Sequence, residues 1–281
     1  MATIDTIADR STGSAIAGKA YFETSTNKFI VFNGTAWIEL DSDGVGAAFE
    51  NRWGASFDGT DDTLSVSDSS LDLKTDFSIS CWFNRGSGVA SWDALVSWGE
   101  ASSGKYRAFG FNAINNLTFN AYGMGYSSSG QTLSNSTWYH GVLTLSGTGS
   151  NAVAKVYVNG SLDSTVTGFA LVDYSTYAGQ LFGASTYGGA ERFEGEMDDL
   201  AIFNTVLDQT AVTALYNSGV PARVTGATGY WRMGDDLNDS ATSGGSISTI
   251  TDSSGNGNDA TQGTASNQPT FSDLTGETIY V

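Results

Sequence analysis

The sequence contains very little cysteine, histidine or proline, and each shortage excludes a kind of protein. Cys81 is the only cysteine among 281 residues, so no disulfide can form within the chain and a disulfide-stapled scaffold is excluded. His140 is the only histidine, which rules out a metal site built from several imidazoles. Only 2 prolines accompany 35 glycines, a composition typical of many tight turns between strands.

Basic residues and long apolar runs are also scarce. Lys and Arg total 12 against 30 Asp and Glu, and the formal net charge of -18 opposes binding to phosphate backbones and anionic lipids. No segment approaches the roughly 18 apolar residues of a membrane span, and residues 1–10 lack the apolar core of a secretory signal. We therefore expect no nucleic-acid partner, no membrane insertion, and synthesis in a cytoplasm without a visible export signal.

Alternating apolar and polar residues predict an all-β protein. Strands are expected at residues 77–83, 94–98, 106–112, 117–122 and 137–145, separated by clusters of Gly, Ser and Asn. Asn159-Gly160 predicts a hairpin. Residues 207–219 form the one expected helix, with Asp208 as N-cap and Gly219 as its stop.

The segment from Phe193 to Phe203 is the most informative part of the chain. A strand there would place Glu194, Glu196 and Asp198 on one face, together with Leu200 and Ile202. With the opening segment 56–66 and the helix, it resembles a laminin G-like, concanavalin A-like jelly roll over roughly residues 56–220. The resemblance implies a two-sheet antiparallel sandwich with one short helix, a fold used mostly to hold sugars or neighbouring proteins.

Laminarinase-like glycosidases of the same fold carry a Glu-x-Asp-x-x-Glu strand. Glu196 and Asp198 match that pattern, but Ala201 replaces the second glutamate. Retaining hydrolysis needs two carboxyl groups about 5 Å apart. We therefore predict that the protein is not an enzyme, and a glycoside hydrolase is the least favoured alternative.

Three regions are expected along the chain. Residues 1–45 contain strands around Tyr21, at 28–32 and at 36–40, the last two joined by Asn33-Gly34. This small β-hairpin module resembles one found in structural and fibre proteins of tailed bacteriophages. Residues 46–224 form the laminin G-like jelly roll, and residues 225–281 either close the sandwich from the carboxyl end or form a small lobe.

Two groups of oxygen ligands are candidates for structural calcium. The resemblance points to Asp58, Asp198 and Asp199, between the opening and closing strands. The alternative is a loop that places Asp252, Ser254, Asn256 and Asn258 at alternate positions. That loop lacks the final bidentate glutamate of an EF-hand, so Asx-turn hydrogen bonds explain it better.

Four aromatic residues in or beside expected loops are candidates for glycan binding. They are Trp92, Tyr122, Tyr126 and Tyr187. In the first module, the apolar residues Phe29, Val31, Phe32, Trp37 and Ile38 need a partner surface, because so small a unit buries little by itself. We expect them to mediate attachment and homo-oligomerisation, with a trimer favoured.

Together these features favour a non-enzymatic structural protein on the virion surface of a tailed phage, as a capsid decoration or fibre component. Its partners would be a capsid or tail protein and, on the outward side, a host surface polysaccharide. The alternative is a glycan-binding adhesin or carbohydrate-binding module.

Overall fold

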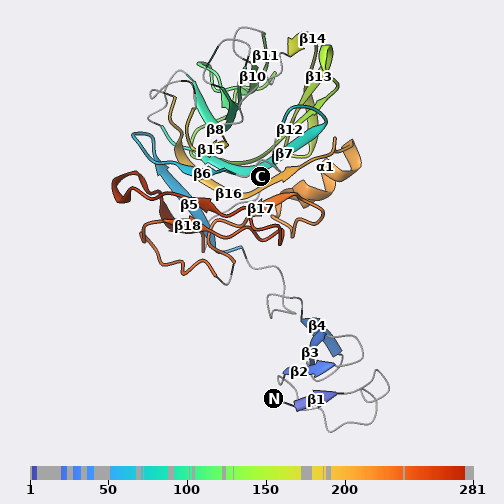
Figure 1. Cartoon of the computed structure of the whole chain (residues 1–281), viewed down its shortest axis with the longest axis vertical. Helices are drawn as coiled ribbons and strands as arrows, with labels where there is room; N and C mark the ends of the chain where they lie inside the picture. The colour runs from blue at the N-terminus through green and yellow to red at the C-terminus, as the bar shows by residue number, and fades with distance from the viewer. Residues whose placement is uncertain are drawn as a thin grey trace. The chain divides into compact units, whose positions relative to one another are not determined.

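The fold comes from a computed structural model, in which the chain divides into two compact units, Met1–Glu50 and Asn51–Val281 (Figure 1). Side chains are described for residues 51–67, 71, 73–87, 92–100, 102, 105–121, 130–167, 179–185, 187, 191–236 and 238–275. For residues 2–4, 20–23, 28–32, 37–40, 125–128 and 168–171 the structure describes the backbone alone.

The first unit contains a four-stranded sheet in the order β1-β2-β3-β4. Its strands are β1 (Ala2–Ile4), β2 (Ala20–Glu23), β3 (Lys28–Phe32) and β4 (Trp37–Leu40). Strands β2, β3 and β4 match the three predicted strands, whereas β1, which pairs parallel to β2, was not predicted. The side chains of the predicted attachment residues Phe29, Val31, Phe32, Trp37 and Ile38 lie outside the described residues.

The second unit is built from two antiparallel sheets. The first sheet has the order β11-β10-β9-β8-β15-β6-β19-β18. Its strands are β11 (Gly125–Ser128), β10 (Leu117–Ala121), β9 (Tyr106–Phe111), β8 (Asp93–Gly99), β15 (Gln180–Phe182), β6 (Leu64–Val66), β19 (Ala260–Thr261) and β18 (Thr249–Ile250).

The second sheet has the order β14-β13-β12-β7-β16-β5-β20, and a short strand β17 also pairs with β16. Its strands are β14 (Ser161–Leu171), β13 (Gly149–Val158), β12 (Trp138–Ser146), β7 (Phe77–Arg85), β16 (Glu194–Phe203), β5 (Trp53–Asp58), β20 (Thr270–Asp273) and β17 (Gly229–Trp231).

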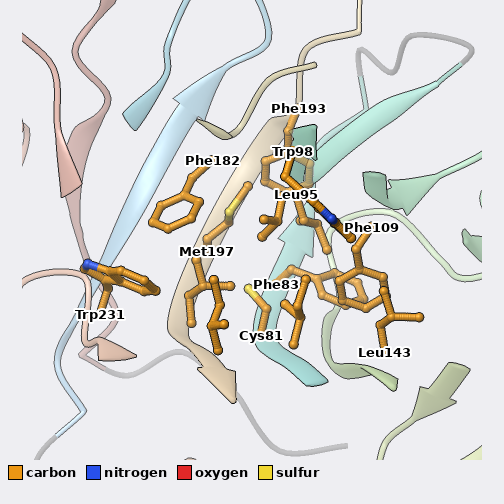
Figure 2. Close-up of a cluster of buried hydrophobic side chains, with 14 of the residues drawn as sticks. Cys81, Phe83, Leu95, Trp98, Phe109, Leu143, Phe182, Phe193, Met197 and Trp231 are labelled. Atoms are coloured by element: carbon orange, nitrogen blue, oxygen red, sulfur yellow. The ribbon is translucent and has the colours of Figure 1, made fainter. Parts of the chain in front are cut away.

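A continuous aromatic and aliphatic core holds the sheets together. Phe83 and Met197 from the second sheet meet Trp98 and Phe109 from the first, and Cys81 is buried among them (Figure 2). Burial of such side chains stabilises each by roughly 1.5–3 kcal/mol. The two antiparallel sheets and their shared core confirm the predicted jelly-roll sandwich.

Residues after the helix contribute to both sheets. Strand β20 pairs with β5, and β19 pairs with β6, so segments far apart in sequence become neighbours. Trp231, Met233 and Phe271 are part of the same core. Residues 225–281 thus supply strands to both sheets and side chains to the core of the second unit.

The predicted helix is α1 (Gln209–Tyr216), followed by a 3₁₀ turn at Asn217–Gly219. The side chain of Asp208 caps it by accepting a hydrogen bond from the Ala211 N–H at 2.8 Å. Val212 packs against Val142 and Tyr157, so the helix covers the outer side of β12 and β13. In the part of the chain that the structure describes, no helix has the length and apolarity needed to cross a membrane.

Candidate functional site

Three neighbouring strands, β8, β9 and β10, present small or polar side chains on the face opposite the core. Directly paired residues of antiparallel strands share a face. The pairs are Ala94 with Gly110, Gly110 with Thr118, and Ala108 with Asn120. Phe109 and Phe119 project to the other face and belong to the core. The outer face therefore carries a continuous patch with few bulky side chains.

A shallow hollow that is open to solvent lies over this patch. Its remaining lining consists of Trp92, Asp93, Tyr106, Phe111 and Glu191. The hollow is a shallow depression rather than an enclosed cavity, so a ligand would rest on it with one ring of a larger molecule instead of entering it. We call it the β8–β10 pocket.

A tyrosine and a carboxylate are fixed together at this pocket. The Tyr106 hydroxyl donates a hydrogen bond to Glu191 Oε2 at 3.1 Å. Burial, followed by the nearby Glu191 charge, raises the pKa of Tyr106, so its hydroxyl stays a neutral donor. The ring of Tyr187, 39% exposed, lies 5.6 Å from that of Tyr106. The Ser185 N–H donates to the Glu191 carbonyl at 3.0 Å, which ties the two loop segments together.

An ion pair anchors the strand beside the pocket. Arg85 Nε donates to Asp93 Oδ2 at 2.9 Å, and both side chains are almost completely buried. The guanidinium carbon of Arg85 also lies 4.6 Å from the centroid of the Phe111 ring. The negative charge of Asp93 is thus compensated inside the protein.

Two of the four predicted glycan-binding residues reach this site. Trp92 lines the pocket and Tyr187 packs on a lining residue. Tyr126 stands opposite Asn120 in the strand register, but its side chain, like all of Tyr122, lies outside the described residues. Glu191 was missed, because no local pattern marks it and only the tertiary fold brings its loop to Tyr106.

Glu194, Glu196 and Asp198 of β16 were predicted to share one face. The pairing of β16 with β7 is regular as far as Asp198, in agreement with that prediction. Between Asp198 and Ala201 the pairing with β7 shifts, and Asp199 has a φ of 45°. This bulge adds one residue and reverses the alternation. Leu200 and Ile202 therefore lie in the core, so their predicted place on the carboxylate face was wrong.

The residues that match the hydrolase pattern are held by polar neighbours. Glu196 accepts hydrogen bonds from Asn84 Nδ2 at 3.1 Å and from the Ser272 hydroxyl. Asp198 is completely buried and accepts from Asn51 Nδ2 at 2.7 Å. Neither side chain lines the β8–β10 pocket.

The bulge carries a buried acidic cluster, consisting of Asp198, Asp199 and Asp235 with Arg232 beside them. Burial is the main cause that raises the pKa of each carboxyl, well above the ordinary value for Asp198, to about 7 for Asp199 and to about 6 for Asp235. Tyr230 donates to Asp199 Oδ1 at 2.5 Å.

Asp199 Oδ2 in this cluster and Oδ1 of Asn51, which donates to Asp198, are buried without a hydrogen-bond partner among the described groups. When all three carboxyl groups are ionised, the single guanidinium of Arg232 compensates only one of them. The cluster then carries excess negative charge. Oxygen donors with excess negative charge fit a hard cation such as calcium.

The predicted calcium ligands do not converge on a single point. Asp58 lies opposite Glu194 in the register, whereas Asp198 follows Met197, which lies opposite Ala55. Asp58 instead groups with Asp61 and Asp62, which form the one set of three or more acidic, Cys or His ligands within 4.8 Å in the described part of the chain. Two separate acidic groups thus replace the one predicted.

The alternative loop is organised by its own hydrogen bonds. Asp252 accepts from the N–H groups of Tyr230, Ser254 and Asn258, each at 2.9 Å. The side-chain amides of Asn256 and Asn258 donate to the Thr228 carbonyl at 3.0 and 2.9 Å. These contacts match the expected Asx-turn loop.

Comparison with known proteins agrees with this architecture. A family model described as the concanavalin A-like lectin/glucanases superfamily matches residues 58–213. A putative carbohydrate binding protein from Bacteroides ovatus is similar in structure, with a TM-score of 0.58 and 15% identity over 92% of this chain and 70% of that one. A comparison with curated proteins gives no match.

Two further solved structures are similar over a smaller part of the chain. The heptameric SAP-like pentraxin from Limulus polyphemus has a TM-score of 0.47 and 18% identity over 63% of this chain and 87% of that one. The CBM40 of Ruminococcus gnavus IT-sialidase, bound to α2,3 sialyllactose, has a TM-score of 0.47 and 12% identity over 58% and 96%. Because the family model matches more than half of the chain, the protein belongs to the concanavalin A-like lectin/glucanase superfamily.

Proposed function

We propose that the protein is a glycan-binding module and that the β8–β10 pocket receives a terminal sugar. The main observation is the pocket itself, which Trp92 and Tyr106 line together with small residues and in which a hydrogen bond from Tyr106 holds Glu191 in place. Aromatic rings stack on the apolar faces of sugars, while carboxylate and amide oxygens accept from their hydroxyls. Membership of a lectin and glucanase superfamily supports this proposal.

Binding without hydrolysis is part of the proposal. Ala201 stands where laminarinase-like enzymes have a glutamate, and Asp198 is inaccessible to a substrate. We expect no turnover of common β-glucans. Turnover that disappears in Glu196→Gln would overturn the non-enzymatic assignment.

A glycan array probed with the full chain tests the binding function. Wild-type protein should retain a defined set of glycans, and Tyr187→Ala and Trp92→Ala should each weaken retention about tenfold or more. Leu162→Ala is the control, since Leu162 is 47% exposed on β14 of the other sheet. Retention of no glycan by wild type, or equal losses in all three variants, would contradict the proposal.

We also propose that the module is carried on the surface of a tailed-phage particle, attached through its first unit to a capsid or tail protein. The support is the phage-like sequence of residues 1–45 and the sheet that includes its predicted hairpin. Mass spectrometry of purified particles from the phage that encodes this chain should detect it. Particles without it would contradict the virion assignment and leave the glycan-binding proposal intact.

A further inference from the structure

The β8–β10 pocket has an unequal balance of charge. Asp93 and Glu191 line it, and no lysine or arginine is among its described lining residues. Because Arg85 compensates Asp93 inside the protein, Glu191 supplies the charge that a ligand would meet. A net charge of -18 over the whole chain reinforces this negative potential.

Arg192 follows Glu191 in sequence, but it lies near Asp62 and is not among the described lining residues. The two basic residues next to Tyr106 in sequence are engaged elsewhere. Lys105, next to Tyr106 in sequence, pairs with Glu100 at 2.7 Å. Arg107 follows Tyr106 in β9, so its side chain projects from the opposite face of the strand. There it donates a hydrogen bond to the Leu73 carbonyl at 3.2 Å. Neither cation lines the pocket to offset Glu191.

Glu191 retains capacity to accept hydrogen bonds from a ligand. A carboxylate has about four lone-pair sites, and the Tyr106 hydroxyl uses one of them. That hydrogen bond also fixes the orientation of the carboxylate. A donor that carries positive charge would make the strongest hydrogen bond with it.

The aromatic groups at the pocket favour the same ligand. Trp92 lines the pocket together with Glu191, and the exposed Tyr187 packs on the buried Tyr106 with the two rings tilted by 43° to each other. An ammonium group is attracted to an aromatic face within about 6 Å. Aromatic rings next to one carboxylate therefore suit a cation attached to a sugar ring.

We propose that the pocket selects a hexosamine with a free amino group, whose ammonium pairs with Glu191 while its ring lies against the aromatic side chains. This inference rests on the proposed glycan-binding function and specifies its ligand. Sugars that carry carboxylate or sulfate would meet Glu191 as a like charge and bind more weakly. An N-acetylated hexosamine has no cation and falls between the two.

Methyl glycosides provide the test, because they differ at one group. Binding of the full chain to methyl glucosaminide, methyl galactosaminide, their N-acetyl forms and methyl glucuronide is measured by ligand-detected NMR titration at about pH 6, where the amine is protonated. At least one amino sugar should bind about tenfold more tightly than its N-acetyl form. Raising the salt concentration should reduce that ratio.

Glu191→Gln should bring the ratio close to one while N-acetyl sugars still bind. Glu194→Gln, which alters a half-buried carboxylate on β16 outside the pocket, should leave the ratio unchanged. Equal or tighter binding of the N-acetyl or acidic sugar by wild type would overturn this inference and preserve the glycan-binding function. Absence of binding to every sugar here and on the array would overturn both.

Discussion

Asp199 combines two unfavourable features in one residue, a left-handed backbone and a buried carboxyl group. Its φ of 45° belongs to the bulge of β16, and its side chain is 2% exposed. A non-glycine residue held in this backbone region costs of order 1–3 kcal/mol and persists only where its surroundings fix it. Tyr230 and the neighbouring Asp198 are the groups that fix it here.

Replacing Asp199 should therefore change stability in a pH-dependent way. Its pKa is raised from 3.8 to about 7, mainly by burial, so this group favours the folded state at low pH and loses that contribution between pH 3.8 and about 7. In chelator, Asp199→Asn should be more stable than wild type at pH 8, by on the order of a few kcal/mol. Urea denaturation at pH 4 and 8 measures this.

The exposed Asp76 provides the matched control, and Asp76→Asn should show no such difference. An Asp199→Asn stability change that is identical at both pH values would show that the carboxyl does not titrate on folding.

His140 has the opposite dependence on pH. It is buried on β12, with Nε2 2.8 Å from the Ser80 hydroxyl and its ring 5.0 Å from that of Trp82, so it serves as a packing residue. Burial lowers its pKa from 6.5 to about 3, so the stability that its neutral form provides is lost as pH falls from 6.5 toward 3.

The slope from this one group is at most about 1.4 kcal/mol per pH unit. The free energy of unfolding of His140→Gln should decline less than that of wild type between pH 6 and pH 4. Ser80→Ala, which keeps the buried imidazole, should retain the wild-type decline. Parallel curves for His140→Gln and wild type would exclude the histidine as the source.

At the scale of elements, α1 depends on its cap because it has only eight residues. Asp208→Ala removes the acceptor for the Ala211 N–H and should cost about 0.5–2 kcal/mol. Thr210→Ala, at an exposed position of the same turn, should cost less. A shift in the urea midpoint measures both, and equal midpoints for the two variants would argue against the cap.

The buried acidic cluster joins β16 to the segment around Asp235, and its excess negative charge makes it one of two candidates for calcium, besides the group of Asp58, Asp61 and Asp62. We expect chelation to lower the melting temperature of wild type, because a bound cation would compensate its excess charge. Asp198→Ala should remove that sensitivity, whereas Asp58→Asn should retain it. Scanning calorimetry distinguishes these outcomes, and an identical melting curve with and without chelator would exclude a structural ion.

At the scale of the whole molecule, the division into two units allows a test of whether the chain forms a trimer through its first unit. The unit Asn51–Val281 contains its own core, so it should remain folded when expressed alone. Light scattering should give a trimer for the full chain and a monomer for the unit that starts at Asn51. A monomer in both cases would contradict attachment through the first unit.

Local signals in the sequence were sufficient for part of this structure. Alternation located the sandwich strands, Asn159-Gly160 the hairpin of β13 and β14, and Asp208 the helix start, because each depends on neighbours in sequence. The bulge at Asp199 and the meeting of Tyr106 with Glu191 depend on pairing across more than eighty residues. No periodicity in a single segment encodes those contacts, so Asp235 and Arg232 of the acidic cluster and most of the pocket were not predicted.

The strands after α1 also determine when the protein can fold during synthesis. Strand β20 covers the edge of β5, and β19 covers β6, although about two hundred residues separate each pair in sequence. The ribosome adds roughly 5–20 residues per second, so the edges of β5 and β6 remain uncovered for about 10–40 s. Such edges pair readily with other chains. Slow translation of the second unit should therefore promote aggregation, and a chaperone that shields nascent strands should raise the yield.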